Sequence, residues 1–276
     1  MIDSADMIKK GAEYGPGNSG KALAVACRVR EAEDSGELPR GHCRVLLDRD
    51  WTALASDIHS RAITRHASEH DRLCYLTKGH SIENYLLTGD WSHHELKMCF
   101  PDLVTEETAE AWKLASEAAT ELAFAFSWAM CESMIANRMG ALPRVEDIAI
   151  DSGGRFVLQE TLAKEMTRRG VDGAVTWVSN VNKRNGIPLY ATLDEARLLA
   201  HGKIALMVTR TCLAVVLRGY GVDGGLCDQV ASGRQDERWR SAFAWLAAQD
   251  PDLTHPLREL AELAIGATPP TDTMLS

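Results

Sequence analysis

Two short, continuously apolar runs are the clearest pattern in the first hundred residues. Residues 45–47 (Val-Leu-Leu) and 73–76 (Leu-Cys-Tyr-Leu) each have the length of a strand, and neither alternates with polar residues. Such runs are typical of parallel strands that are buried on both faces. Between them, residues 51–67 carry apolar side chains at i, i+3 and i+4 spacing, which predicts the crossover helix that a parallel pair requires. The pattern therefore predicts a β-α-β unit.

Helical patterns follow this unit. Ser81 is well placed to cap a helix in which Ile82, Tyr85 and Leu86 lie on one face. Residues 106–139 are rich in alanine and apolar on more than one face, which indicates a helix or helix pair that is buried or forms a homodimer interface. Further helices are predicted at about 157–169, 193–218, 235–249 and 255–264.

These elements place the chain in the α/β class. We expect residues 1–90 to form a small parallel sheet with flanking helices. Residues 91–276 are expected to form a largely α-helical elaboration, with a short strand near 173–178, that packs on the core or completes it. Hydrophobic residues make up 45% of the 276 residues, which is enough to bury a sizeable core.

Acidic side chains follow both predicted strands. Asp48 and Asp50 come directly after the first strand, and Glu83 and Asn84 lie in the first turn of the helix after the second. Open α/β sheets place their ligand sites at the carboxyl ends of their strands. Converging carboxylates repel one another unless a cation lies between them, and hard oxygen ligands of this kind suit Mg²⁺ or Mn²⁺. The alternative is a turn in which both aspartates are solvated.

A glycine-rich segment offers a competing interpretation. Residues 15–22 (Gly-Pro-Gly-Asn-Ser-Gly-Lys-Ala) match the G-x-x-x-x-G-K part of a phosphate-binding loop. Ala22, however, stands where a Ser or Thr hydroxyl should bind Mg²⁺, and no convincing buried strand precedes Gly15. We therefore interpret the segment as a turn that enters a helix containing residues 23–29, whose N-terminus could still attract a nucleic-acid phosphate.

Composition limits the class of protein. No apolar stretch reaches the length of a membrane-spanning helix, and no amino-terminal signal peptide is visible. The seven cysteines include no C-x-x-C pair, which indicates reduced thiols and a cytoplasmic protein. His93 and His94 lie near Glu95 and Cys99, but adjacent residues on a helix point about 100° apart, so we expect solvated side chains rather than a zinc site.

The formal net charge of −9 offers no general attraction to nucleic acid, so any such binding must be local. Lys164, Arg168 and Arg169 end one predicted helix, and Lys183 and Arg184 follow the predicted short strand. These residues are either favourable helix-terminal charges and a solvated loop, or groups that hold a phosphate backbone.

Three segments resemble the Toprim family. They are LLDRDW at residues 46–51, YLT with SIENYLL at residues 75–77 and 81–87, and LLAHGKIALM at residues 198–207. More narrowly, the chain resembles the Toprim-like proteins encoded beside ATPases in bacterial antiphage loci, such as the AriB-like effectors of PARIS systems, and the Toprim domains of OLD-family nucleases. The resemblance spans roughly residues 15–220, and implies a Toprim-like fold for the parallel core.

The resemblance, with the acidic pattern, predicts a metal-dependent nuclease that acts as the effector of an antiphage or toxin system. Asp48, Asp50 and Glu83 would bind Mg²⁺ or Mn²⁺, which activates water and polarises the phosphate. Glu83 could instead act as general base, and Asn84 would orient that carboxylate or a phosphate oxygen. Lys203 would neutralise charge that builds on the phosphate. Resemblance alone favours RNA, tRNA in particular, over DNA, and implies an ATPase partner.

One departure from the family leaves an alternative open. Toprim proteins carry a catalytic glutamate at the end of their first strand, and here only Glu13 is available, after residues that make a poor buried strand. Either the start of the domain is missing or Glu13 is a displaced substitute. The alternative function is a non-catalytic Toprim-like partner or regulatory subunit that docks on an ATPase.

Overall fold

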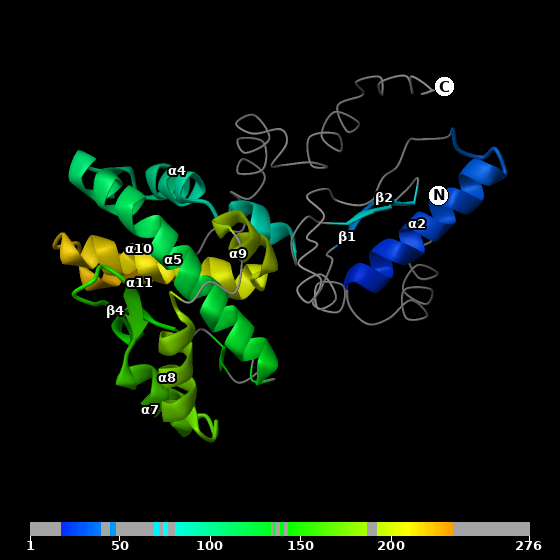
Figure 1. Cartoon of the computed structure of the whole chain (residues 1–276). Helices are drawn as coiled ribbons and strands as arrows, with labels where there is room; N and C mark the ends of the chain where they lie inside the picture. The colour runs from blue at the N-terminus through cyan, green and yellow to red at the C-terminus, as the bar shows by residue number, and fades with distance from the viewer. Residues whose placement is uncertain are drawn as a thin grey trace. The chain divides into compact units, whose positions relative to one another are not determined.

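The computed structural model describes residues 18–39, 45–47, 69–71, 74–76, 81–133, 135, 139–140, 143–186 and 192–233 (Figure 1). The chain divides between Lys78 and Gly79 into two compact units. The predicted crossover helix at 51–67, the predicted helices at 235–249 and 255–264, and Glu13 lie outside the described residues.

In the first unit, the described residues form one helix and a three-stranded sheet. Helix α2 (Asn18–Asp34) contacts β1 (Val45–Leu47), and the strand order is β1-β3-β2. Strands β1 and β3 (Cys74–Leu76) are parallel, with Leu47 opposite Leu76, so both apolar runs form strands and pair as predicted. Strand β2 (Glu69–Asp71) is antiparallel to β3 and was not predicted, because a polar Glu-His-Asp edge strand has no apolar pattern to reveal it.

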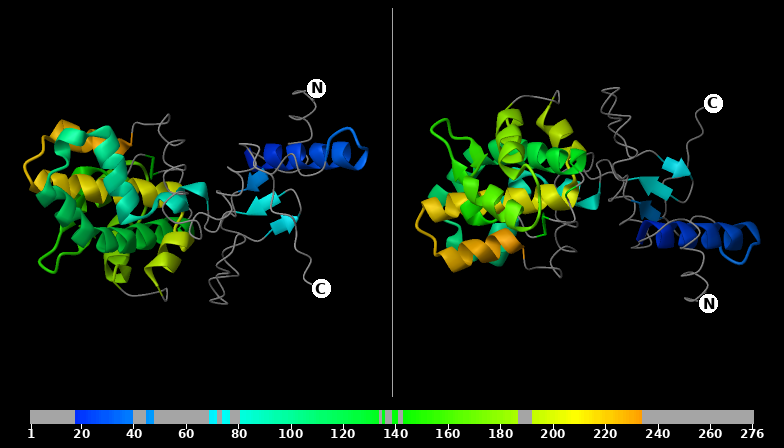
Figure 2. Two further views of the ribbon diagram at one scale, coloured as in Figure 1. Left: turned by 90° about the horizontal axis from the view of Figure 1, so that it is seen from above. Right: turned by 90° about the horizontal axis from the view of Figure 1, so that it is seen from below.

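The second unit is mostly helical. Its central pair is α5 (Glu106–Glu132) and α10 (Gly202–Gly219), which lie against each other in both views of Figure 2. Trp112 and Phe126 on α5 and Leu217 on α10 are fully or almost fully buried. Burying large apolar side chains of this kind stabilises a fold by about 1.5–3 kcal/mol each. The long apolar helix predicted at 106–139 is thus a core helix over residues 106–132.

The remaining elements surround this pair. They are η1 (Ile82–Leu86), α4 (Gly89–Cys99), η2 (Pro101–Leu103), η3 (Val145–Asp147), β4 (Ile148–Ile150), β5 (Phe156–Leu158), α7 (Glu160–Arg168), α8 (Ala174–Arg184), α9 (Leu193–Leu199) and α11 (Gly224–Ser232). Both helices and strands are present, so the chain has a mixed α and β fold in which helices predominate. In the described residues, no helix is long and apolar enough to cross a membrane.

The prediction of a short strand at 173–178 was wrong, because this segment begins helix α8. Its buried residues Ala174, Val178 and Val181 recur at helical spacing, while Val175 is 71% exposed. Gly173 precedes the helix with a φ of +69°, which a glycine adopts without strain. The run Ala-Val-Thr-Trp-Val has high strand propensity, but packing of one helical face against its neighbours outweighs that preference.

The described residues form a second sheet before α7 and α8, an antiparallel hairpin of β4 and β5. A turn at residues 151–154 joins these strands, and Asp151 fixes it by accepting hydrogen bonds from the N–H groups of Gly153 (2.8 Å) and Arg155 (3.0 Å). The helix predicted from residue 157 therefore starts only at Glu160. Three-residue strands are too short to give a clear alternating pattern in sequence.

The helix predicted at 193–218 is broken into α9 and α10. Ala200 and His201 between them have extended backbone angles, with ψ values of 148° and 105°. Nothing in the local sequence requires this break, since Ala200 is a good helix former. Its cause is a long-range contact with Asn84, which is part of the candidate site.

Candidate functional site

Three of the five predicted site residues are described by the structure. Glu83 and Asn84 lie in η1, and Lys203 lies in the first turn of α10, all in the second unit. Asp48 and Asp50 lie outside the described residues, although Leu47, which immediately precedes Asp48 in the sequence, ends β1 at the edge where the parallel strand β3 also ends.

The start of η1 is held by a reciprocal pair of hydrogen bonds. The N–H of Ser81 donates to Oδ1 of Asn84 (2.8 Å), and the N–H of Asn84 donates to the carbonyl of Ser81 (3.1 Å). Ser81 has extended backbone angles, as an N-cap residue should. The predicted helix start at Ser81 is confirmed, although the helix is a short 3₁₀ helix rather than a long α-helix.

Asn84 also joins η1 to the break between α9 and α10. Its Nδ2 donates to the carbonyls of Arg197 (2.7 Å) and Ala200 (2.8 Å), and its side chain is fully buried. These carbonyls are the ones that the end of α9 leaves without helical partners. The side chain is therefore fully engaged with the backbone, and it can orient the neighbouring carboxylate only by fixing the chain around Glu83.

Gly202 allows α10 to begin directly against η1. A Cβ atom at this position would lie 2.2 Å from Oγ of Ser81, 2.8 Å from Oδ1 of Asn84 and 3.0 Å from Cβ of Glu83. Only glycine lets the backbone of α10 lie so close to the side chains at the start of η1. The consequence is that the following residue, Lys203, extends its side chain toward Glu83.

Glu83 and Lys203 form a loose, asymmetric ion pair. Nζ of Lys203 lies 4.0 Å from Oε1 of Glu83, which is too long for a hydrogen bond. The Glu83 side chain is 9% exposed, whereas that of Lys203 is 72% exposed. Oε2 of Glu83 is buried and has no hydrogen-bond partner among the described residues. Burying a carboxylate oxygen without a hydrogen-bond partner costs folding free energy, unless a ligand, water or cation interacts with that oxygen.

This carboxylate suits a hard cation, but it does not form a metal site by itself. Within the described part of the chain, no three His, Cys, Asp or Glu side chains come together to hold a metal ion. Glu83 would need further oxygen ligands, and Asp48 and Asp50 are the candidates that the sequence provides.

The sequence did not lead us to predict that Gly202 allows α10 to begin against η1. The signal available was an isolated glycine at the start of an apolar helical run, which often marks a close backbone contact. The buried Ser127 was also missed; its Oγ accepts a hydrogen bond from the N–H of His201 (3.2 Å) and so helps to hold the break open.

A glycine pair on α10 tests this geometry. Gly202→Ala should lower the free energy of unfolding by about 1–3 kcal/mol, because the new methyl group overlaps Ser81 and Asn84. Gly219→Ala, at the other end of the same helix, meets no atom of the described residues within 4 Å and should leave stability unchanged or raise it by up to about 1 kcal/mol. Urea unfolding of both variants measures the difference. Equal stabilities would mean that α10 does not lie this close to η1.

The histidine pair in α4 has no metal-site geometry among the described residues. The pKa of His94 is lowered, first by partial burial and then by repulsion from His93 and Lys97. His94 is therefore more often neutral at pH 7 than an ordinary histidine.

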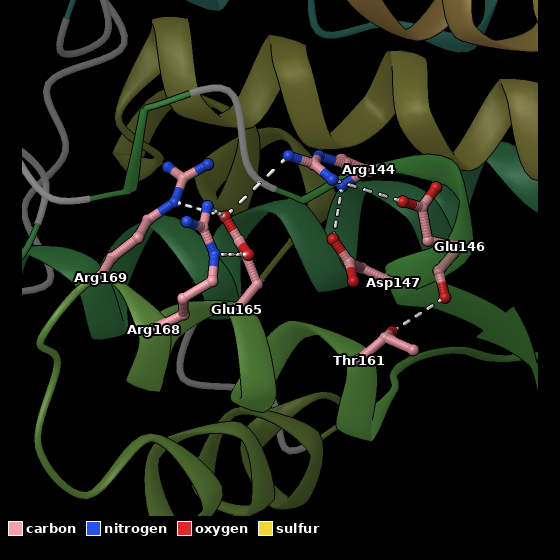
Figure 3. Close-up of polar contacts among 7 residues, drawn as sticks. All are labelled: Arg144, Glu146, Asp147, Thr161, Glu165, Arg168 and Arg169. Carbon is pink, nitrogen blue, oxygen red and sulfur yellow. Dashed lines mark hydrogen bonds and ion pairs between the residues drawn. The ribbon is translucent and has the colours of Figure 1, made fainter.

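The basic residues at the end of α7 are paired with acids. Figure 3 shows Arg144, Arg168 and Arg169 around the carboxylate of Glu165. Nε and Nη2 of Arg168 each donate to it at 2.7 Å, and Nε of Arg169 donates at 2.8 Å. Arg144 also faces Glu146 and donates its backbone N–H to Asp147 (2.9 Å). The three arginines are balanced by three carboxylates, so this cluster ties α7 to η3 and has no excess positive charge.

Glu165 should make stability depend on pH. Hydrogen bonds from Arg168 and then Arg169 lower the pKa of its carboxyl to about 2, from an ordinary value of 4.5. Its stabilising effect is therefore fully present above about pH 4.5, and is lost as the pH falls toward 2. Glu165→Gln should be less stable than the wild type at pH 7, with the difference shrinking between pH 4.5 and pH 2. Thermal unfolding across this range measures it, and a constant difference would show that the charge of Glu165 is not involved.

No protein-family model matches this chain, and no curated protein has a significantly similar sequence.

Proposed function

We propose that this protein is a metal-dependent, phosphodiester-cleaving nuclease of the Toprim-like kind. The observation that carries the proposal is the pairing of Glu83 and Lys203. These residues are far apart in the sequence, and both were predicted to belong to the site. The fold holds them 4.0 Å apart, and one oxygen of the carboxylate has no hydrogen-bond partner among the residues that the structure describes. A buried acid beside an exposed cation is an arrangement that phosphoryl-transfer sites use.

In this proposal, Glu83, Asp48 and Asp50 hold Mg²⁺ or Mn²⁺. The observation that fits a cation ligand is Oε2 of Glu83, because it is a hard, buried oxygen to which no group in the described part of the chain donates a hydrogen bond. The ion would supply a polarised phosphate and an attacking water of lowered pKa. Asp48 and Asp50 follow the apolar run of residues 45–47 in the sequence, and they are the further carboxylate ligands that this proposal requires.

Lys203, Asn84 and Gly202 have supporting roles in this proposal. The Lys203 ammonium is exposed enough to contact a phosphate oxygen and to offset the charge that develops there. Asn84 and Gly202 are positioning residues, since they fix the backbone on either side of the pair. Electrostatic stabilisation depends on such fixed groups, because a group that must reorganise during the reaction contributes less.

The substrate proposed is RNA, with tRNA favoured through the Toprim-like resemblance, and DNA as the alternative. Given the net charge of −9, binding must depend on local cations such as Lys203 and on the metal itself. The same resemblance suggests an antiphage or toxin effector that an ATPase partner restrains.

The direct test is a cleavage assay with purified full-length protein. Labelled tRNA, single-stranded RNA and duplex DNA should be examined with Mg²⁺, with Mn²⁺ and with EDTA. Cleavage of at least one substrate that EDTA abolishes is expected, together with a rise in melting temperature on adding Mg²⁺ or Mn²⁺, because ligands that bind the folded state stabilise it. Asp50→Ala is the matched variant, and it should lose both effects.

A non-catalytic binding subunit is the second candidate. The observation in its favour is that Lys203 already places a positive charge beside Glu83, so that the carboxylate is partly neutralised without a metal. Absence of cleavage with every substrate, and equal toxicity of wild type and Asp50→Ala in a bacterial host, would favour this function over the nuclease.

A further inference from the structure

A second feature of the helical unit is an open hollow between α7, α8 and β5. Its volume is about 430 Å³, within the range of sites that bind small ligands or side chains of a partner. Leu158, Ala163 and Val178 line it and are buried, while Val175 on α8 is 71% exposed at its margin. None of these residues belongs to the site of Glu83 and Lys203.

The wall formed by α8 and β5 is firmly held. Asn182 on α8 accepts a hydrogen bond from the N–H of Leu158 (2.8 Å) and donates one to the carbonyl of the same residue (2.8 Å). Asn185 donates to the carbonyl of Phe156 (2.6 Å). The hollow is therefore preformed, which lowers the entropic cost of binding there.

These amide contacts also restrict what can bind. The outward N–H and carbonyl of Leu158 are both occupied by Asn182, so a peptide strand cannot extend the sheet at this residue. A groove between two helices accepts the apolar side chains of a third helix more readily. Because the hollow is open and bordered by the exposed Val175, it suits a macromolecular surface better than an enclosed small molecule.

The charges on its rim identify the chemistry of the occupant. Lys183 lines the hollow, is exposed, and has no ion-pair partner within the part of the chain that the structure describes. Arg155 is half-exposed and bonded to Asp151. Glu160, on the opposite side, lies 3.8 Å from Lys164, which offsets its charge. The uncompensated charge is thus positive in a chain whose net charge is −9.

We propose that this hollow, which we name the α7–α8 groove, docks an acidic amphipathic helix of a partner protein. Two apolar side chains one turn apart would enter between Ala163, Val175 and Val178. A flanking Glu or Asp would pair with Lys183. The groove is independent of the proposed cleavage site, so either assignment can fail without the other.

Three synthetic helical peptides test the groove. The first carries two leucines at i and i+4 flanked by glutamates, the second has lysines in place of the glutamates, and the third has alanines in place of the leucines. NMR titration of the full-length protein should show the first peptide shifting the signals of Val175, Val178 and Ser179, and binding about fivefold or more tightly than the other two.

Two exposed substitutions complete the test. Val175→Asp should weaken binding of the acidic peptide about tenfold, because it removes apolar contact and adds a negative charge that repels the glutamates. Lys183→Glu should reverse the preference, so that the lysine-flanked peptide binds better than the acidic one. Both positions are exposed, so an unchanged melting temperature is expected and serves as the folding control.

Three results would overturn the proposal. They are binding of all three peptides alike, no shifts in these residues at millimolar peptide, and an unchanged charge preference in Lys183→Glu. A concentration-dependent dimer that Val175→Asp abolishes, measured by sedimentation velocity, would assign the groove to a second copy of this chain instead.

Discussion

Glu83→Gln should lower the rate of metal-dependent cleavage by about 100-fold or more. Glutamine keeps the size of the side chain and its place in η1, but it removes the negative charge that binds a cation or accepts a proton. The carboxylate is 9% exposed and pairs with Lys203 at 4.0 Å, so the substitution removes a buried negative charge from beside that cation. Initial rates on the preferred nucleic acid, with saturating Mg²⁺ or Mn²⁺, measure the effect.

Matched variants separate loss of charge from loss of fold. Glu117→Gln makes the same chemical change at an exposed position of α5, and should retain full activity. The double variant of Glu83→Gln with Asp50→Ala should be little worse than either single variant, because groups that act as one unit are strongly non-additive. Activity in Glu83→Gln equal to that of Glu117→Gln would exclude Glu83 from the reaction.

Asn84→Ala should lower the free energy of unfolding by about 3 kcal/mol or more. The substitution leaves the buried carbonyls of Arg197 and Ala200 without the donors that the fold provides, and it removes the acceptor for the N–H of Ser81. For a chain of this size, the expected fall in melting temperature is about 5–12 °C. Asn84→Asp should be no better, because a carboxylate cannot donate to either carbonyl.

The control for this stability prediction is Asn180→Ala. Asn180 is an exposed residue of α8, so its replacement should change the melting temperature by about 1 °C or less. If Asn84→Ala were as stable as Asn180→Ala, the α9–α10 break would be held by other contacts. If it were unstable yet cleaved at the wild-type rate once folded, Asn84 would not position Glu83.

The sequence alone determined those elements in which the local pattern of apolar residues and the tertiary packing favour the same secondary structure. The continuous apolar runs at residues 45–47 and 73–76 contain the parallel strands β1 and β3, and a short apolar run without polar alternation is typical of parallel strands. The helix expected at residues 23–29 lies within α2, and most of the apolar segment at 106–139 forms α5. Ser81 was recognised as a helix start from its cap chemistry.

Elements that depend on distant partners were missed or misplaced. Residues 69–71 form an edge strand only because β3 offers its free edge, and the strand tendency of residues 174–178 yields to the burial of one helical face in α8. The candidate site shows the same difference between local and long-range information. The types of residue at positions 83, 84 and 203 identified them as candidates. The sequence could not show that the side chain of Asn84 is fully engaged with backbone carbonyls.

The tertiary structure decided how η1 and the start of α10 meet. Sequence predicted one continuous helix from 193 to 218, since every residue between Leu193 and Arg218 except Gly202 is an acceptable helix former. Asn84 binds the carbonyls that a continuous helix would use, and the missing Cβ of Gly202 lets α10 start against η1. Glu83 and Lys203 are neighbours for that reason: hydrogen-bond satisfaction between distant segments outweighs the local preference of the chain for an unbroken helix.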